Sequence, residues 1–448
     1  MKKIVEKALA GGAESCEVFF LSSLDTAVNF ETSRLKGVSN TEERGVALRV
    51  TKSGRTGFAT STKIDDVDGL VGSALATAPL GDPAGFDFAG AASAADVGVF
   101  DDAVDALSVD EMIAASERAV RMVLDYEKKI NISTEASRSV QEIGVYTSSG
   151  HEASFRRTVF EFSVYGRLVE GTNMLDAGDY YGGTAFELDP EGLAKRTIRD
   201  FERARTNVDV EGGPMSVVLT PRAVCDVMMT LHAGASAGLV DQGISPLVGK
   251  LGDTVFDERV SIFDDGIMPG GHDSAPFDDE GTPMQRTPVV ESGVLRHFLT
   301  DLRTAKKLDL PRTGNGCRVK RLFLTKDLGK MPGPAITNWE MAAGEKPLDE
   351  IVSGLSSGVV VDSIMGILMG NLIAGDFSGN LAYALKIRNG ETVGRVKDAM
   401  IAGNIYGLLK DHLVEISREV ERVGLLGGIG SHRFPYLLLK DVSISAKA

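Results

Sequence analysis

The segment Val46-Ala47-Leu48-Arg49-Val50-Thr51 alternates its larger apolar side chains with smaller or polar ones. This period of two is typical of a β-strand that buries one face. The turn Lys52-Ser53-Gly54-Arg55 follows, and residues 57–60 continue the chain beyond it. The sequence therefore predicts an antiparallel β-hairpin here, and strands through most of the fifty residues after Gly12.

Strands and helices are expected to share the rest of the first half of the chain. Strands are predicted over 130–146 and 158–169, and helices from about Asp65, from the capping box Ser108-Val109-Asp110-Glu111, and from Asp189-Pro190. Residues 79–107 are rich in Gly, Ala, Asp and Pro, so a long surface loop is predicted there. Antiparallel sheets with helices packed on one face define an α+β fold.

A second region is expected to begin at Val208. It contains a predicted strand at 214–219, a helix at 221–232 with an apolar stripe, a helix near 348–355, and strands at 359–362 and 383–387. We therefore predict an N-terminal α+β domain over residues 1–207 and a Gly-rich, β-rich C-terminal domain over 208–448.

Composition and charge argue against some classes of binding partner. The 448 residues include 48 Lys+Arg and 63 Asp+Glu, a net charge of −15, with no Lys/Arg-rich run, which disfavours nucleic acid and anionic membrane surfaces as partners. The apolar stretch 363–375 is shorter than the about 20 residues that a membrane-spanning helix needs, and the N-terminus has no signal-peptide core. A cytoplasmic location is therefore expected.

Motifs of known enzyme classes do not identify an active site in this sequence. Two G-x-S-x-G segments, centred on Ser236 and Ser356, follow predicted helices rather than strands, so we interpret them as turns and not as nucleophile elbows. The three cysteines are far apart, and no two histidines have zinc-site spacing. The cluster Asp264-Asp265, His272-Asp273 and Asp278-Asp279-Glu280 has ligands for a hard cation, although turn chemistry is the favoured explanation.

Several segments together resemble one family. They are Glu31-Thr32-Ser33-Arg34-Leu35-Lys36, Arg44-Gly45-Val46-Ala47-Leu48-Arg49-Val50, Asp278-Asp279-Glu280-Gly281-Thr282-Pro283, Thr313-Gly314-Asn315-Gly316, Gly375-Asp376-Phe377-Ser378 and Ile401-Ala402-Gly403-Asn404. In order and spacing they are similar to the TldD/TldE (PmbA) family, once called modulators of DNA gyrase and better viewed as two-subunit zinc metallopeptidases. The resemblance covers essentially the whole chain.

The resemblance also implies where a zinc site would lie. In the catalytic TldD-type subunit, a helix carries HExxxH and a later cysteine completes the site. An ungapped count places those positions on Met228, Met229 and Ala233, one residue from His232, and the cysteine position near Leu426. Thioether, methyl and isobutyl groups do not form a zinc site. The resemblance thus implies the TldE (PmbA) branch, with no catalytic residue, metal or cofactor in this chain and zinc in a TldD-type partner.

Substrate and partners are expected from the same resemblance. The candidate substrate-binding residues belong to two of the family-like segments: Asp279, Glu280, Gly281, Thr313, Gly314 and Asn315. We expect a homo- or heterodimer formed through the C-terminal region, including 359–375, and small or unfolded peptides that pair with edge strands. Two alternatives stay open: an enzyme that holds zinc through His232, His272 and nearby carboxylates, and a regulator that binds gyrase or another protein without peptidolysis.

Overall fold

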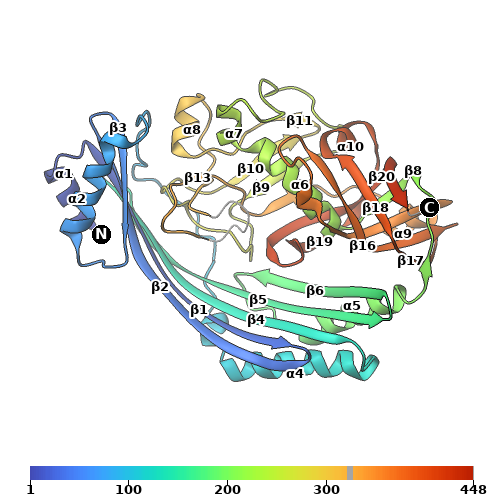
Figure 1. Ribbon diagram of the computed structural model, residues 1–448. Coiled ribbons are helices and arrows are strands. Elements are labelled where there is room, and N and C mark those ends of the chain that lie inside the picture. Colours follow the sequence, from blue (N-terminus) through green and yellow to red (C-terminus); the bar gives the residue numbers. More distant parts are fainter. Residues whose placement is uncertain (320–325, 447–448) are drawn as a thin grey trace.

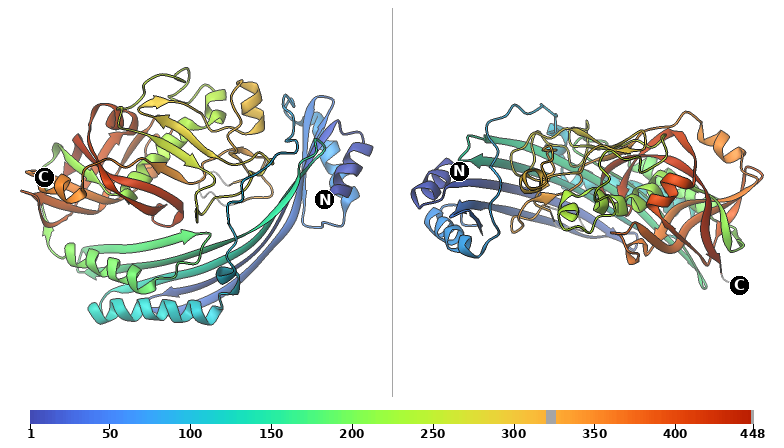
Figure 2. Two further views of the ribbon diagram at one scale, coloured as in Figure 1. Left: turned by 180° about the vertical axis from the view of Figure 1, so that it is seen from behind. Right: turned by 90° about the horizontal axis from the view of Figure 1, so that it is seen from above.

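The computed structural model describes residues 1–319 and 326–446 (Figure 1). A long, curved antiparallel sheet from the first half of the chain forms an arc, and the second half of the chain lies against the concave side of that arc (Figures 1 and 2). The expected α+β class is confirmed, with antiparallel sheets and helices packed on them.

The curved sheet has the strand order β3-β2-β1-β4-β5-β6. Its strands are β1 (Ser15–Glu31), β2 (Arg34–Lys52), β3 (Arg55–Ser61), β4 (Asn131–Thr147), β5 (Glu152–Glu170) and β6 (Asn173–Gly183). The predicted hairpin is confirmed, since β2 and β3 pair in antiparallel register up to Lys52 and Arg55. β6 lies at one edge of this sheet, so one side of its backbone is not paired with another strand of the sheet.

Helices cover the convex side of the arc (Figures 1 and 2). They are α1 (Lys2–Ala10) and α2 (Val67–Thr77) at one end, and α4 (Val109–Tyr126) and α5 (Pro190–Arg203) at the other. α4 begins with the predicted capping box: the Ser108 side chain accepts from the Glu111 N–H, and the Glu111 side chain accepts from the Ser108 N–H. Asp189 caps α5, with Pro190 in its first turn, as predicted.

The prediction of a plain surface loop over 79–107 is wrong in part. This segment ends in the short helix α3 (Asp102–Ala106), begins within the 3-10 turn η1 (Ala78–Leu80), and buries Phe86, Phe88 and Val99. The guanidinium of Arg49 lies 5.0 Å from the ring centroids of both Phe86 and Phe88. These long-range contacts hold the segment against the protein although its composition resembles a loop.

The second half forms a mixed sheet. Its strands are β7 (Asn207–Val208), β8 (Gly213–Leu219), β9 (Ile262–Asp265), β10 (Arg286–Glu291), β11 (Val294–Leu295), β14 (Trp339–Met341), β15 (Ser357–Met365), β16 (Asp376–Arg388), β17 (Glu391–Val396), β18 (Ala399–Asn404), β19 (Leu413–Leu425) and β20 (Ile429–Ala446), with β12 (Gly316–Cys317) and β13 (Gly333–Pro334) paired apart from it. Most pairs are antiparallel, whereas β8–β15, β7–β17 and β14–β20 are parallel.

Helix α6 lies in the centre of this half. The helices here are α6 (Pro221–Ala235), α7 (Ala237–Asp241), α8 (Leu302–Lys307), α9 (Leu348–Ser353) and α10 (Ile405–Asp411), with the 3-10 turn η2 (Ile367–Met369). The predicted apolar stripe of α6 is confirmed, because Val224, Val227, Met228 and Leu231 are all buried. Across the part of the chain that the structure describes, no helix combines the length and apolarity needed to cross a membrane.

Candidate functional site

The segment expected to hold zinc in the family is packed in the core of the second half. α6 starts at the N-cap Thr220 with Pro221 in its first turn, and it packs against the hairpin formed by β19 and β20. A cavity of about 10 Å³ lies between them. It is lined by Cys225, Met228, Met229, His232, Ile336, Trp339, Leu425, His432 and Phe434. That volume is at the lower limit for one water molecule, so the space is essentially filled by side chains.

The structure brings together most of the positions assigned from the family resemblance. Met228 and Met229 line the cavity, and so does Leu425, the neighbour of Leu426. The Leu426 N–H donates a hydrogen bond of 2.7 Å to Asp226 Oδ1, which joins the hairpin turn to α6. Ala233 does not line the cavity, because position i+5 on a regular helix lies about 140° away from position i.

Two histidines line the same cavity. Burial lowers the pKa of His232 and of His432 to about 4, so both imidazoles are neutral near pH 7. His432 Nδ1 accepts a hydrogen bond of 3.1 Å from the Trp339 N–H. Within residues 1–319 and 326–446, no three His, Cys, Asp or Glu side chains form a group able to hold a metal ion.

The alternative ligand pair of His232 and His272 is not supported by geometry. His272 does not line the cavity that contains His232. It lies instead between Asp273 and Glu161, with nitrogen–oxygen distances of 3.1 and 3.5 Å. Burial lowers the pKa of His272, but the two carboxylates outweigh burial and raise it to about 10. The imidazole of His272 is therefore held by two carboxylates and not by the residues around His232.

The candidate substrate-binding residues lie close together but are buried. Asp278 accepts hydrogen bonds from the N–H groups of Glu280, Thr282 and Gly316, at 2.8 to 3.0 Å. This is the turn chemistry that the sequence favoured for the acidic cluster. Neighbouring residues also form contacts: Asp279 accepts from the Arg318 N–H and Lys326 Nζ, and Asn315 Nδ2 donates to Asp264 Oδ2 at 2.6 Å.

The rest of this set is buried in the same way. Glu280 Oε2 accepts from the Leu302 N–H at 2.7 Å, and Thr313 Oγ1 accepts from the Thr300 N–H at 2.9 Å. Gly281 and Gly314 are buried as well, each with a positive φ. Direct contact of these six residues with a substrate stays a prediction, and in the structure their visible role is to fix two neighbouring loops.

A buried ion-pair network joins these loops to the curved sheet. Arg49 Nη2 lies 2.6 Å from Glu17 Oε2 and 2.7 Å from Glu280 Oε1, and Arg318 Nη2 lies 2.7 Å from Glu17 Oε1. All four side chains are almost completely buried. Burial is the main cause that raises the pKa of Glu280 to about 7, against the opposing effect of Arg49. The network is therefore a fully buried polar connection between the two halves of the chain.

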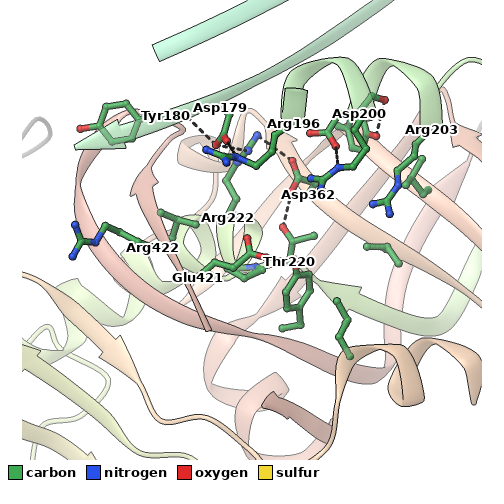
Figure 3. Close-up of a pocket in the computed structure, with 18 of the residues that line it drawn as sticks. Asp179, Tyr180, Arg196, Asp200, Arg203, Thr220, Arg222, Asp362, Glu421 and Arg422 are labelled. Atoms are coloured by element: carbon green, nitrogen blue, oxygen red, sulfur yellow. Dashed lines mark hydrogen bonds and ion pairs between the residues drawn. The ribbon is translucent and has the colours of Figure 1, made fainter. Parts of the chain in front are cut away.

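A cavity of about 580 Å³ lies between the edge of the curved sheet and the mixed sheet (Figure 3). Its walls come from β6, α5, the start of α6, β15, β16 and the hairpin β19–β20. A chain of alternating charges crosses it: Arg196 pairs with Asp179, and Arg222 lies 3.6 Å from Asp179 and 3.2 Å from Asp362. Figure 3 shows Arg203 and Arg422 on opposite sides of this chain.

This cavity was not predicted from the sequence. Its charged residues come from elements separated by up to about half of the chain, so they do not form a sequence motif. The arginines at 196, 199 and 203 are the part that a local pattern could have indicated, because their spacing places them on one face of α5. Burial, together with nearby Asp362, raises the pKa of Asp200 to about 6. The cavity offers both charge signs, hydroxyl groups and an apolar floor, which suits a polar chain such as a short peptide.

Comparison with known proteins assigns the class. Models of the PmbA/TldA metallopeptidase family match residues 16–78 (domain 1), 102–204 (central domain) and 212–446 (C-terminal domain). The protein belongs to the PmbA/TldD family of metallopeptidase-related proteins. This family assignment confirms the resemblance found in the sequence.

Individual relatives agree with this assignment. An uncharacterized protein of Methanocaldococcus jannaschii is 26% identical, covering 92% of this chain and 93% of its own length. The metalloprotease PmbA of Escherichia coli is 24% identical, covering 94% and 92%. Among solved structures, TldE from Thermococcus kodakarensis superposes with a TM-score of 0.90 at 20% identity over the whole of both chains. A candidate modulator of a DNA gyrase from Thermotoga maritima gives 0.88 at 24% identity over 99% of both.

The ion-pair network predicts a large loss of stability when one partner is removed. Glu17→Ala leaves two buried guanidinium groups without their shared carboxylate, and we expect the free energy of unfolding in urea to fall by about 3–5 kcal/mol. The control is Glu152→Ala, which breaks an exposed pair with Lys2 and should cost far less than Glu17→Ala. Equal losses for the two variants would contradict the role given to the network.

Asp226 predicts a dependence of stability on pH. Burial raises its pKa from 3.8 to about 7, so between these values the folded chain binds a proton that the unfolded chain has released. The contribution of the Asp226 carboxyl to the free energy of unfolding therefore falls as the pH rises from 3.8 to about 7. Asp226→Asn should make the free energy of unfolding decline less steeply between pH 5 and 8, with a gain of roughly a few kcal/mol at pH 8.

The matched control for this measurement is the exposed Asp65→Asn, which should leave the pH profile unchanged. A profile for Asp226→Asn that parallels the parent would show that the Asp226 carboxylate is already ionised in the folded state.

Proposed function

We propose that this chain is a non-catalytic, TldE/PmbA-type subunit of a cytoplasmic TldD/TldE-type zinc metallopeptidase complex that acts on small or unfolded peptides. One observation carries the proposal: Met228, Met229 and the turn at Leu426, which the family resemblance assigns to the zinc region, lie close together and supply apolar side chains. Zinc needs nitrogen, thiolate or carboxylate ligands, and this packed cavity has no room for an ion with its water.

The family relationship supports a peptidase context. Similar proteins include the metalloprotease PmbA of Escherichia coli and the metalloprotease TldD homologue of Haemophilus influenzae, the latter 23% identical over 92% of this chain. In the proposal, a TldD-type partner that carries HExxxH holds the zinc. This chain completes the peptide path and positions the substrate backbone.

Open strand edges support peptide binding through the backbone. β6 is an edge of the curved sheet, β19 pairs with β20 on one side, and both strands border the large cavity. An extended peptide that adds to such an edge uses its main-chain N–H and C=O groups, so binding tolerates many sequences. The loops at 279–281 and 313–315 would act by holding the second half of the chain in position for this pairing.

An exposed, uncharged row supports a subunit interface in the C-terminal region. Met365, Asn380, Met400 and Ser445 are register neighbours across β15, β16, β18 and β20, and all four are exposed. Met369, in the adjacent η2 turn, is 86% exposed. We name these five residues the methionine row. Exposed apolar side chains grouped on a sheet face are typical of protein–protein contacts.

The proposed function predicts how much zinc the isolated chain retains. After dialysis, the purified chain should retain well below one zinc per chain and should not hydrolyse an unfolded peptide, since residues 1–319 and 326–446 contain no group of three ligands able to hold the ion. Metal analysis and a fluorescent peptide assay measure this. One tightly held zinc per chain, together with cleavage that a chelator stops, would refute the proposal and favour an independent enzyme.

The proposed interface predicts that a charge in the methionine row weakens assembly. Met369→Asp places a charge in the methionine row and should weaken assembly, with itself or with a TldD-type subunit, by about tenfold or more. Analytical ultracentrifugation measures the change. Leu24→Asp, an exposed leucine of β1, is the matched control and should assemble like the parent. Unchanged assembly of Met369→Asp would place the interface elsewhere.

A further inference from the structure

The methionine row supplies the large apolar side chains of its part of the sheet face. Met365 on β15, Asn380 on β16 and Met400 on β18 are direct register partners, so both thioethers lie on the same face with Asn380 between them. The next row on this face consists of Ser378, Ala402 and Ser443. These side chains are small, and neither row contains a charged residue. The apolar character of both rows therefore depends on the methionines.

The three methionines of the row are open to solvent in the isolated chain. Met369 is 86% exposed, Met365 is 61% exposed and Met400 is 44% exposed. Five other methionines are buried in the cores of the molecule: Met112, Met228, Met268, Met284 and Met341. A dissolved oxidant must reach the sulfur atom to react with it, so the sulfur atoms of the row are favoured over those in the cores.

The cysteines do not compete with the row for an oxidant. The chain has three cysteines, Cys16, Cys225 and Cys317, and all three are buried. Burial raises the pKa of each thiol, so near pH 7 each remains in its protonated form. The thiolate is the reactive form of cysteine, and buried thiols are inert. Exposed thioethers are therefore the sulfur groups that this chain offers to an oxidant.

We propose that the methionine row is an oxidation site, at which a peroxide converts Met365, Met369 and Met400 to methionine sulfoxide and thereby weakens assembly with the partner subunit. The inference rests on the proposed function, in which this row is a subunit interface. At each residue the sulfur gives an electron pair to one peroxide oxygen, so the S–O bond forms as the O–O bond breaks. The second oxygen leaves as water, with sulfur oxidised and the peroxide reduced by two electrons.

A sulfoxide changes what the row offers to a partner. Its oxygen accepts hydrogen bonds strongly, and burying that oxygen against an apolar surface without a donor is costly. Conversion of flexible apolar thioethers to polar groups therefore disrupts methionine-rich contacts. Reductases return methionine sulfoxide to methionine, so the change is reversible. The buried methionines are not involved, and the fold of the free chain is expected to stay intact.

The test oxidises this chain alone before it meets a partner. The purified full chain is treated with limiting hydrogen peroxide, catalase removes the excess, and peptide mass spectrometry locates the sulfoxides. We expect Met369 to be oxidised first and the five buried methionines last. Analytical ultracentrifugation with an untreated TldD-type subunit from the same organism should then show assembly weakened by about tenfold or more. Methionine sulfoxide reductase should restore the assembly.

A matched variant separates the row from the other methionines. Leucine is similar to methionine in size and apolarity but forms no sulfoxide. The combined change Met365→Leu, Met369→Leu and Met400→Leu should therefore assemble like the parent, both before and after peroxide. Met174 and Met331, which are 53% and 43% exposed, remain available to peroxide in this variant. Equal loss of assembly in the oxidised variant and the oxidised parent would place the effect at another site and overturn the inference.

Met369→Asp distinguishes a failure of this inference from a failure of the proposed interface. If Met369→Asp weakens assembly but sulfoxides at all three positions do not, the interface stands and the inference is overturned. If neither change weakens assembly, the row is not the interface, and both the interface and the inference are wrong.

Discussion

The shared carboxylate of Glu17 is the contact on which the arrangement of the two halves depends. It lies on β1 and binds Arg49 of the neighbouring strand and Arg318 of the second half, while Arg49 also reaches Glu280. Unpaired buried charges are costly, so a shift of the loops away from the sheet would be opposed by the loss of these ion pairs. Because Arg49 also contacts Phe86 and Phe88, the same network holds part of the segment 79–107 against the protein.

Side chains pack closely around α6 in the region that the family resemblance assigns to zinc. In a structural zinc site the ion stabilises the fold, whereas here Met228, Leu425 and Phe434 fill the space between α6 and the β19–β20 hairpin. The bond from the Leu426 N–H to Asp226 holds the hairpin turn to the helix. The helix and the hairpin are thereby held together by side-chain packing and a backbone hydrogen bond.

Sequence patterns predicted the helices and strands correctly where the structure depends on residues that are close together in the chain. Alternation over 46–51, the Ser108–Glu111 capping box and the α6 stripe gave the correct elements, because each depends on residues a few positions apart. The buried phenylalanines of 79–107 and the large cavity were missed because both depend on contacts between distant segments. The turn chemistry expected for the acidic cluster is found at Asp278, whereas Asp264 and Glu280 are held by contacts with Asn315 and Arg49 that the sequence could not show.

The central claim is that this chain contributes structure and peptide contacts, but no zinc, to a two-subunit metallopeptidase. It is tested most directly by measuring hydrolysis of an unfolded peptide by a TldD-type subunit from the same organism, with and without this chain, while zinc is counted in each subunit. The account predicts that rapid hydrolysis needs both subunits and that all of the zinc stays with the partner. Full activity of the partner alone, or zinc bound to this chain within the active complex, would contradict it.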